Sequence, residues 1–188
     1  MTKMNTMCAM AACAGIAGLA VGDTITLDLA GVNSNDNFGS PNNEMSLVAL
    51  GDVTITGIGW DNVVGNGDDT GVTWGNEMTM AVVDSGDLNG VFVSFFPSEG
   101  GATAGGVWGP ASSGGIVDLV SQGLAFNTAS GSLLIEFFES YNDVDGATDA
   151  HYESGTVVIE YEASTPVVPG IGGLAALAGV GLFGRRRR

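Results

Sequence analysis

Apolar and polar residues alternate along most of the central part of the chain. In 24–29 and in 157–162 every second residue is apolar, which places the apolar side chains on one face. A period of two predicts half-buried β-strands. The segments that we predict as strands are 24–29, 45–50, 52–58, 78–83, 91–96, 115–120, 132–138 and 157–162.

Turn-forming residues separate these segments. Gly, Asn and Asp are concentrated in 35–37, 65–69, 88–90, 100–106 and 143–149. No part of the central region carries a sustained helical pattern or a repeat of fixed period. We therefore predict an all-β fold, an antiparallel two-sheet sandwich of jelly-roll type, with an immunoglobulin-like sandwich as the alternative.

The C-terminal end has a different pattern, since 167–183 is mostly apolar and is followed by basic residues. As a helix with a rise of about 1.5 Å per residue, this segment spans roughly 25 Å, close to the ~30 Å of a membrane's hydrocarbon core. We predict one transmembrane helix, with a buried core helix or a disordered basic tail as alternatives. Its anchoring side chains are Leu174, Leu177, Val180, Leu182 and Phe183. The basic cluster, expected on the cytoplasmic side, is Arg185, Arg186, Arg187 and Arg188.

The N-terminal end has the layout of a secretory signal peptide. Lys3 precedes the apolar run 4–20, which ends in small residues. Cys13 suggests lipidation as an alternative, and both cysteines lie in this leader, so no disulfide is expected after its removal. We divide the chain into a signal peptide (1–20), an exported β-sandwich domain (21–164) and a sorting and anchoring segment (165–188).

Charge is distributed unevenly along the chain, whose formal net charge is −16. All 21 acidic residues lie between Asp23 and Glu162, a stretch without Lys or Arg. Nucleic acid is therefore not expected as a partner, because nothing in the body neutralises phosphate. Bound divalent ions or a salty environment would relieve the mutual repulsion of the carboxylates.

The two ends together resemble proteins that carry the PEP-CTERM sorting signal, the substrates of exosortase-type membrane enzymes. The sorting motif of that family corresponds here to Pro166, Pro169 and Gly170, with Val167 and Val168 between the prolines in place of a Glu-containing spacer. The resemblance covers 165–188 and the leader. It implies the export machinery and an exosortase as partners, or retention of the tail as a simple anchor.

Calcium is the cofactor that the loops suggest, because carboxylate and amide oxygens on Gly-containing loops are the hard ligands that Ca²⁺ prefers. Neither the segment 66–69 nor the segment 142–149 has the ligand spacing of an EF-hand. Asp and Asn are also common turn residues, so a purely structural role is the alternative. The candidate ligands are Asp68, Asp69, Asp143, Asp145 and Asp149.

Catalytic groups are sparse. His151 is the only histidine, and we expect an ordinary surface residue. Glu136 and Glu139 would suit a glycosidase only if they faced one cleft, and the alternative is a solvated strand edge. Tryptophans and tyrosines either form a sugar-binding platform or pack in the core and at its rim. The aromatic residues in question are Trp60, Trp74, Trp108, Tyr141 and Tyr152.

These features predict a non-enzymatic exported protein, anchored in the inner membrane before processing and then placed at the cell surface or outside the cell. We expect a structural or adhesive component of the surface or of an extracellular polysaccharide matrix. The alternative is a carbohydrate- or calcium-binding module at the same location, and a glycan hydrolase comes third.

Overall fold

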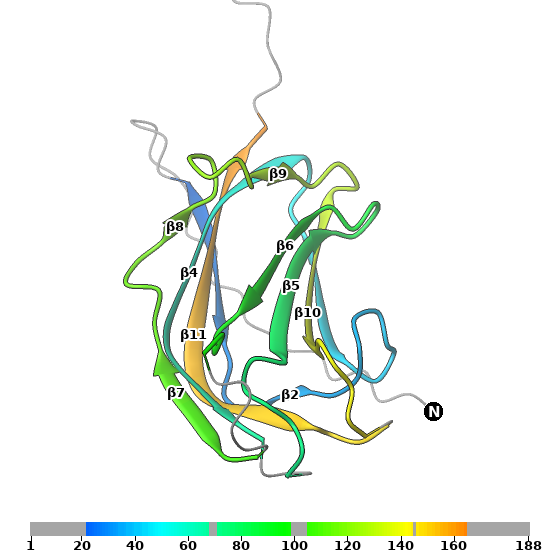
Figure 1. Cartoon of the computed structure of the whole chain (residues 1–188). Helices are drawn as coiled ribbons and strands as arrows, with labels where there is room; N and C mark the ends of the chain where they lie inside the picture. Colours follow the sequence, from blue (N-terminus) through cyan, green and yellow to red (C-terminus); the bar gives the residue numbers. More distant parts are fainter. Residues whose placement is uncertain (1–21, 68–70, 99–104, 145, 165–188) are drawn as a thin grey trace, which may run out of the picture.

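The computed structural model describes residues 22–67, 71–98, 105–144 and 146–164, and these residues form strands and loops without a helix. The strands belong to two antiparallel sheets that face each other (Figure 1). Their bounds are β1 Asp23–Asp28, β2 Val32–Ser34, β3 Glu44–Ala49, β4 Val53–Asn66, β5 Met78–Asp84, β6 Gly90–Ser94, β7 Val107–Ala111, β8 Val117–Asp118, β9 Phe126–Asn127, β10 Ser132–Glu139 and β11 Ala150–Ala163.

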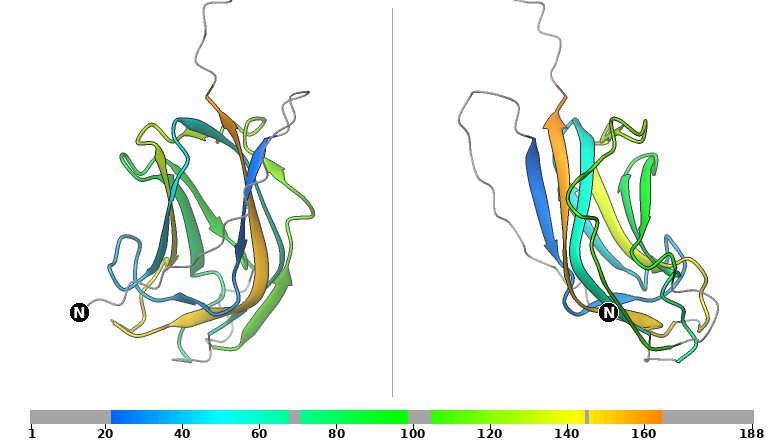
Figure 2. Two further views of the ribbon diagram at one scale, coloured as in Figure 1. Left: turned by 180° about the vertical axis from the view of Figure 1, so that it is seen from behind. Right: turned by 60° about the vertical axis from the view of Figure 1, so that its left-hand side comes forward.

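The larger sheet is built around the two longest strands, β4 and β11, each of 14 residues. Its order is β1-β11-β4-β7, and β2 pairs with β11 while β8 and β9 pair with β4. The β11–β4 ladder contains irregularities between Tyr152 and Ser154, between Ser154 and Thr156, and between Glu160 and Tyr161. Bulges of this kind bend a strand, which agrees with the curvature of β11 in Figure 2.

The smaller sheet has the order β3-β10-β5-β6. Its central strand β10 pairs with β3 on one side and with β5 on the other. β5 is buried at every position. Continuous burial requires cover on both faces, and the loop 35–43 provides part of the second cover by placing Phe38 against Phe138, with ring centroids 5.4 Å apart.

One hydrophobic core fills the space between the sheets. It takes Ile55 and Ile159 from the larger sheet and Met80, Leu133 and Ile135 from the smaller one, all of them fully buried. A second, smaller cluster lies on the outer face of the smaller sheet. Every-second-residue alternation therefore directs side chains into one shared interior, as the sequence pattern predicts.

The all-β prediction and the two antiparallel sheets are confirmed for the described residues. Each predicted strand has a counterpart, although 115–120 contains only the short β8 at Val117–Asp118. β4 and β11 extend well beyond the predicted 52–58 and 157–162, and β2, β7 and β9 are not predicted at all. The missed strands are short or Gly- and Pro-containing, so alternation within them is too brief to recognise.

The predicted signal peptide and the predicted C-terminal helix lie outside the described residues. Within the described part of the chain, no helix long and apolar enough to span a membrane is found.

Candidate functional site

Among the described residues, five carboxylates are buried in a body whose sequence offers them no Lys or Arg. Ionised carboxylates are costly to bury unless hydrogen-bond donors, a proton or a cation compensate them. How each one is compensated therefore separates structural carboxylates from candidate binding groups. The buried carboxylates are Asp36, Asp84, Glu136, Glu139 and Asp149.

Glu136 lies on the outer face of the smaller sheet, beneath the loop 35–43. Its Oε1 accepts hydrogen bonds from the backbone N–H of Gly39 at 2.7 Å and from Nδ2 of Asn43 at 2.6 Å. The side chain is only 1% exposed, so the expected solvated strand edge is wrong at this position. The loop that covers the strand arrives from another part of the sequence, and local alternation cannot reveal it.

Asp36 connects the loop 35–43 to the β10–β11 connection through hydrogen bonds of its carboxylate. Its Oδ2 accepts hydrogen bonds from Ser40 Oγ at 2.9 Å and Asn42 Nδ2 at 2.6 Å, within its own loop. Its Oδ1 accepts from Asn142 Nδ2 at 3.0 Å and from the N–H of Gly146 at 3.1 Å, in the β10–β11 connection. These donors, Asn42 foremost, hold the pKa of Asp36 below its usual value. Asp36 is thus a structural carboxylate.

Glu139 occupies a place where four strands begin or end. It is the last residue of β10, Ser34 is the last of β2, Asp149 directly precedes β11, and Glu77 directly precedes β5. Backbone hydrogen bonds hold these ends together, from the Asp149 N–H to the Ser34 carbonyl at 3.1 Å and from the Ser140 N–H to the Glu77 carbonyl at 2.8 Å. We call Ser34, Glu77, Glu139, Asp149 and Tyr152 the Glu139 cluster.

Burial and neighbouring acids strongly perturb this cluster. Burial first, and then the charges of Asp149 and Glu77, raise the pKa of Glu139 to about 9, while the Ser34 hydroxyl acts in the opposite direction. Burial also raises the pKa of Asp149 and of Glu77. A carboxyl group that resists ionisation inside a group of acids either keeps a proton or accepts a cation.

Two hydroxyl groups complete the cluster. Both residues are fully buried; the Ser34 hydroxyl acts on the Glu139 carboxylate, whereas the Tyr152 hydroxyl has no hydrogen-bond partner among the described residues. The Tyr152 ring packs edge-on against Phe95 and Phe137, with centroids 5.6 Å and 5.5 Å away. Burial, and then the negative charge of Glu139, raise the pKa of the Tyr152 hydroxyl. This hydroxyl therefore lies near the Glu139 carboxylate.

The predicted calcium ligands are only partly within the described structure. Asp68, Asp69 and Asp145 lie outside the described residues. Asp143 and Asp149 are brought together by their loop, where burial raises the pKa of Asp149 and the backbone amides of Asp143 and Val144 oppose that rise. Among the described residues, no three His, Cys, Asp or Glu side chains form a group able to hold a metal ion.

Sequence reasoning missed Ser34, Glu77 and Tyr152 as members of the cluster and assigned Glu139 to a strand edge. One pattern does point to Glu139, because it continues the face of Leu133, Ile135 and Phe137, which is the core face. An acid in register with a core face is a charged group directed inward. The other members come from distant strands, so no spacing along the chain indicates them.

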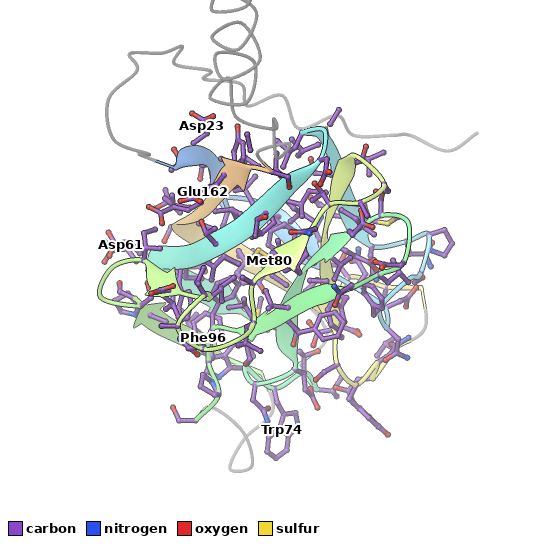
Figure 3. The ribbon with its side chains drawn as sticks, turned by 90° about the horizontal axis from the view of Figure 1, so that it is seen from above. Asp23, Asp61, Trp74, Met80, Phe96 and Glu162 are labelled. Atoms are coloured by element: carbon purple, nitrogen blue, oxygen red, sulfur yellow. The ribbon has the colours of Figure 1, made fainter. Side chains whose placement is uncertain are left out.

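The aromatic residues do not form one platform. Trp108 and Tyr152 are buried in the core, whereas Tyr141 is 65% exposed. Trp60 lines a groove of about 270 Å³ on the larger sheet, together with Asp61 and Ile116, and a groove of about 420 Å³ adjoins it through Asp61 and Thr156. Trp74 lies at the rim on a different side of the molecule from Asp61 (Figure 3).

Comparison with protein-family models, with curated proteins and with solved structures finds no match.

Proposed function

We propose that this protein is an exported, non-enzymatic surface protein, a structural or adhesive component of the cell surface or of an extracellular polysaccharide matrix. The C-terminal segment 165–188 anchors or sorts it, through the export machinery and an exosortase-type enzyme. The body carries the negative charge and stays outside, whereas the Arg cluster stays in the cytoplasm.

The observation that carries this proposal is the placement of the chain ends. Asp23 at the start of β1 pairs with Tyr161 near the end of β11, so the first and the last described strands have these two ends side by side at one pole of the body (Figure 1). The loops that contain Asp36 and Asp149 lie at the opposite end of β11 (Figure 1). A tail fixed in a membrane would therefore present the acidic loops away from it.

The strand order supports a jelly-roll sandwich as the finer fold class. β1 and β2 follow one another along β11, and β7, β8 and β9 all lie along β4, so each set acts as one long strand. With these sets merged, every connection except β5 to β6 crosses from one sheet to the other. Such alternation is typical of jelly rolls, which serve as binding and shell domains as well as enzymes.

The proposed membrane or surface location is tested by expressing the full chain and a chain that ends at Ser164 in an exosortase-containing Gram-negative bacterium. We expect the full chain in the membrane or surface fraction, with its body cleaved by protease added outside the inner membrane. The shortened chain should be recovered as a soluble exported protein. Equal fractionation of the two chains would contradict the proposal, and a full chain with Arg185–Arg188 replaced by Ala separates the role of charge from that of the apolar segment.

The second candidate function is a carbohydrate- or calcium-binding module at the same location. The grooves on the larger sheet favour a sugar ligand, because Asp61 and Thr156 line both of them and supply carboxylate and hydroxyl groups that can hydrogen-bond a sugar. Affinity electrophoresis in gels that contain extracellular polysaccharide tests this, with Asp61→Ala as the groove variant and Asp52→Ala as the control. Equal retardation of both variants would contradict a role of the groove.

A further inference from the structure

Glu139 has less internal compensation than Asp36 and Glu136. Asp36 accepts hydrogen bonds from four donors, and Glu136 Oε1 accepts two. By contrast, the fully buried carboxylate of Glu139 accepts no hydrogen bond of ordinary length from the described residues, and only the Ser34 hydroxyl favours its ionised form. A buried carboxylate without donors requires a positive charge or a proton.

The segment 22–164 contains no Lys or Arg that could meet that requirement, and its one histidine, His151, is not among the groups that act on Glu139. The charged groups around Glu139 are Asp149, Glu77 and Asp143, and all of them disfavour its ionised form. A positive charge at this position therefore has to come from solution.

The hydroxyl groups of Ser34 and Tyr152 are an observation independent of the acids. Both are fully buried. The Ser34 hydroxyl acts on the Glu139 carboxylate, whereas the Tyr152 hydroxyl has no hydrogen-bond partner among the described residues and is influenced by the charge of Glu139. Buried hydroxyl groups without partners are rare in native proteins and call for a bound ion or water. Because both hydroxyl groups lie near the Glu139 carboxylate, they indicate a binding site for a cation that oxygen atoms coordinate.

We propose that the strand ends at Ser34, Glu139 and Asp149 form a binding site for a hard divalent cation, most simply Ca²⁺. The ligands are the two carboxylates and the Ser34 hydroxyl, with water in the remaining positions, while the Tyr152 hydroxyl donates a hydrogen bond to Glu139. Glu77 adds negative charge at the edge. This mixed set agrees with the absence of three acids grouped as metal ligands among the described residues.

The chemistry selects Ca²⁺ over the other common metals. Ca²⁺ accepts six to eight oxygen ligands in flexible geometry, including waters, whereas transition metals favour the Cys and His ligands that this cluster lacks. Extracellular modules bind Ca²⁺ with Kd values of about 10⁻⁴ to 10⁻³ M, which suits an exported protein. This inference rests on the calcium-binding form of the second candidate function.

The position of the site gives the cation a structural role. It would link β2, β10 and β11 at the pole where the Asp36 loops also meet, so binding would stiffen the end of the body opposite the anchor. An ion bound only in the folded state raises stability in proportion to the logarithm of its concentration.

The test uses the full chain in detergent, with Ca²⁺ alone as the probe in calorimetry and thermal unfolding. At about 10 mM Ca²⁺ we expect the Tm to rise by at least about 3 °C over NaCl of equal ionic strength. Glu139→Gln keeps the shape of the side chain and removes its charge, and this variant should lose the calcium response. Glu136→Gln is the matched control, because it changes a buried carboxylate on the same strand and should keep the response.

Two results would overturn the inference, and they differ in meaning. Equal calcium responses in Glu139→Gln and in the unchanged chain would place the ion elsewhere and leave the calcium-binding function intact. The absence of any response in the unchanged chain would remove the function as well as the site. Because Gln at position 139 relieves buried charge, the variant should fold at least as well as the parent, which keeps the comparison interpretable.

Discussion

Glu136 and Glu139 lie three positions apart on β10 and are both buried, yet they face opposite sides of the smaller sheet. Glu136 accepts hydrogen bonds from the covering loop, and Glu139 faces the interior near Ser34 and Tyr152. An odd spacing on a strand places two side chains on opposite faces. The two carboxylates therefore cannot flank one glycosidic bond, and each has its own role.

Asn43 holds the outer-face loop over Glu136. Its Nδ2 donates to Glu136, and its Oδ1 accepts from the N–H of Asp36 at 2.8 Å. Replacement by Ala leaves buried polar groups without partners, and we expect a loss of about 1–3 kcal/mol in the free energy of unfolding. Urea denaturation measures the change. Asn127→Ala, at an exposed residue that bonds only the Thr54 side chain, should change stability by less than about 0.5 kcal/mol.

Glu139 should make the calcium-free protein less stable as the pH rises. Its pKa is raised from 4.5 to about 9 in the folded state, so the folded protein retains a proton that the unfolded chain releases. The stability contributed by this proton is complete below pH 4.5 and is lost progressively up to pH 9. The slope reaches about 1.4 kcal/mol per pH unit at most.

Glu139→Gln should abolish that slope. Denaturation curves at several pH values, recorded with a calcium chelator, provide the measurement. A parent protein whose stability is flat between about pH 5 and 8 would show that Glu139 is ionised or compensated without a metal.

Tyr152 carries a buried hydroxyl that has no hydrogen-bond partner among the described residues. Tyr152→Phe keeps the ring contacts with Phe95 and Phe137 and removes only the hydroxyl. We expect the calcium-free variant to be as stable as the parent or more stable, by up to about 2 kcal/mol, since a buried unsatisfied group is removed. Tyr141→Phe changes an exposed ring and should have no effect, so a clear destabilisation by Tyr152→Phe alone would reveal a hydrogen bond absent from the structure.

The contact between Asp84 and Ser130 should contribute to the loss of protein stability at low pH. The Ser130 hydroxyl and N–H both donate to the Asp84 carboxylate, and these bonds lower the pKa of Asp84 below 3.8. A lowered pKa contributes stability above pH 3.8 that is lost as the pH falls through the folded-state value. Ser130→Ala should therefore weaken the protein at neutral pH and leave it nearly unchanged in strong acid. A difference that persists undiminished at low pH would indicate that Ser130 acts through packing instead.

Period-two alternation was sufficient to locate the core strands. Leu133, Ile135 and Phe137 on β10 illustrate why, since the same face stays buried along the whole strand and the pattern is local. β7 could not be found in this way, because Trp108 is followed by Gly109 and Pro110, which interrupt the alternation. Its place beside β4 depends on a partner strand that lies more than forty residues earlier in the chain.

The sequence by itself determined the all-β class and the acidic body without Lys or Arg. It also predicts a membrane location from the apolar tail that ends in Arg residues. These properties depend on composition and on local periodicity. Only the tertiary structure decided which carboxylates are compensated, because donors such as Asn43 and hydroxyls such as that of Ser34 reach their carboxylates from distant strands and loops. Burial and hydrogen bonding are set by the packing of the two sheets, and they distinguish Glu139 from the structural carboxylates around it.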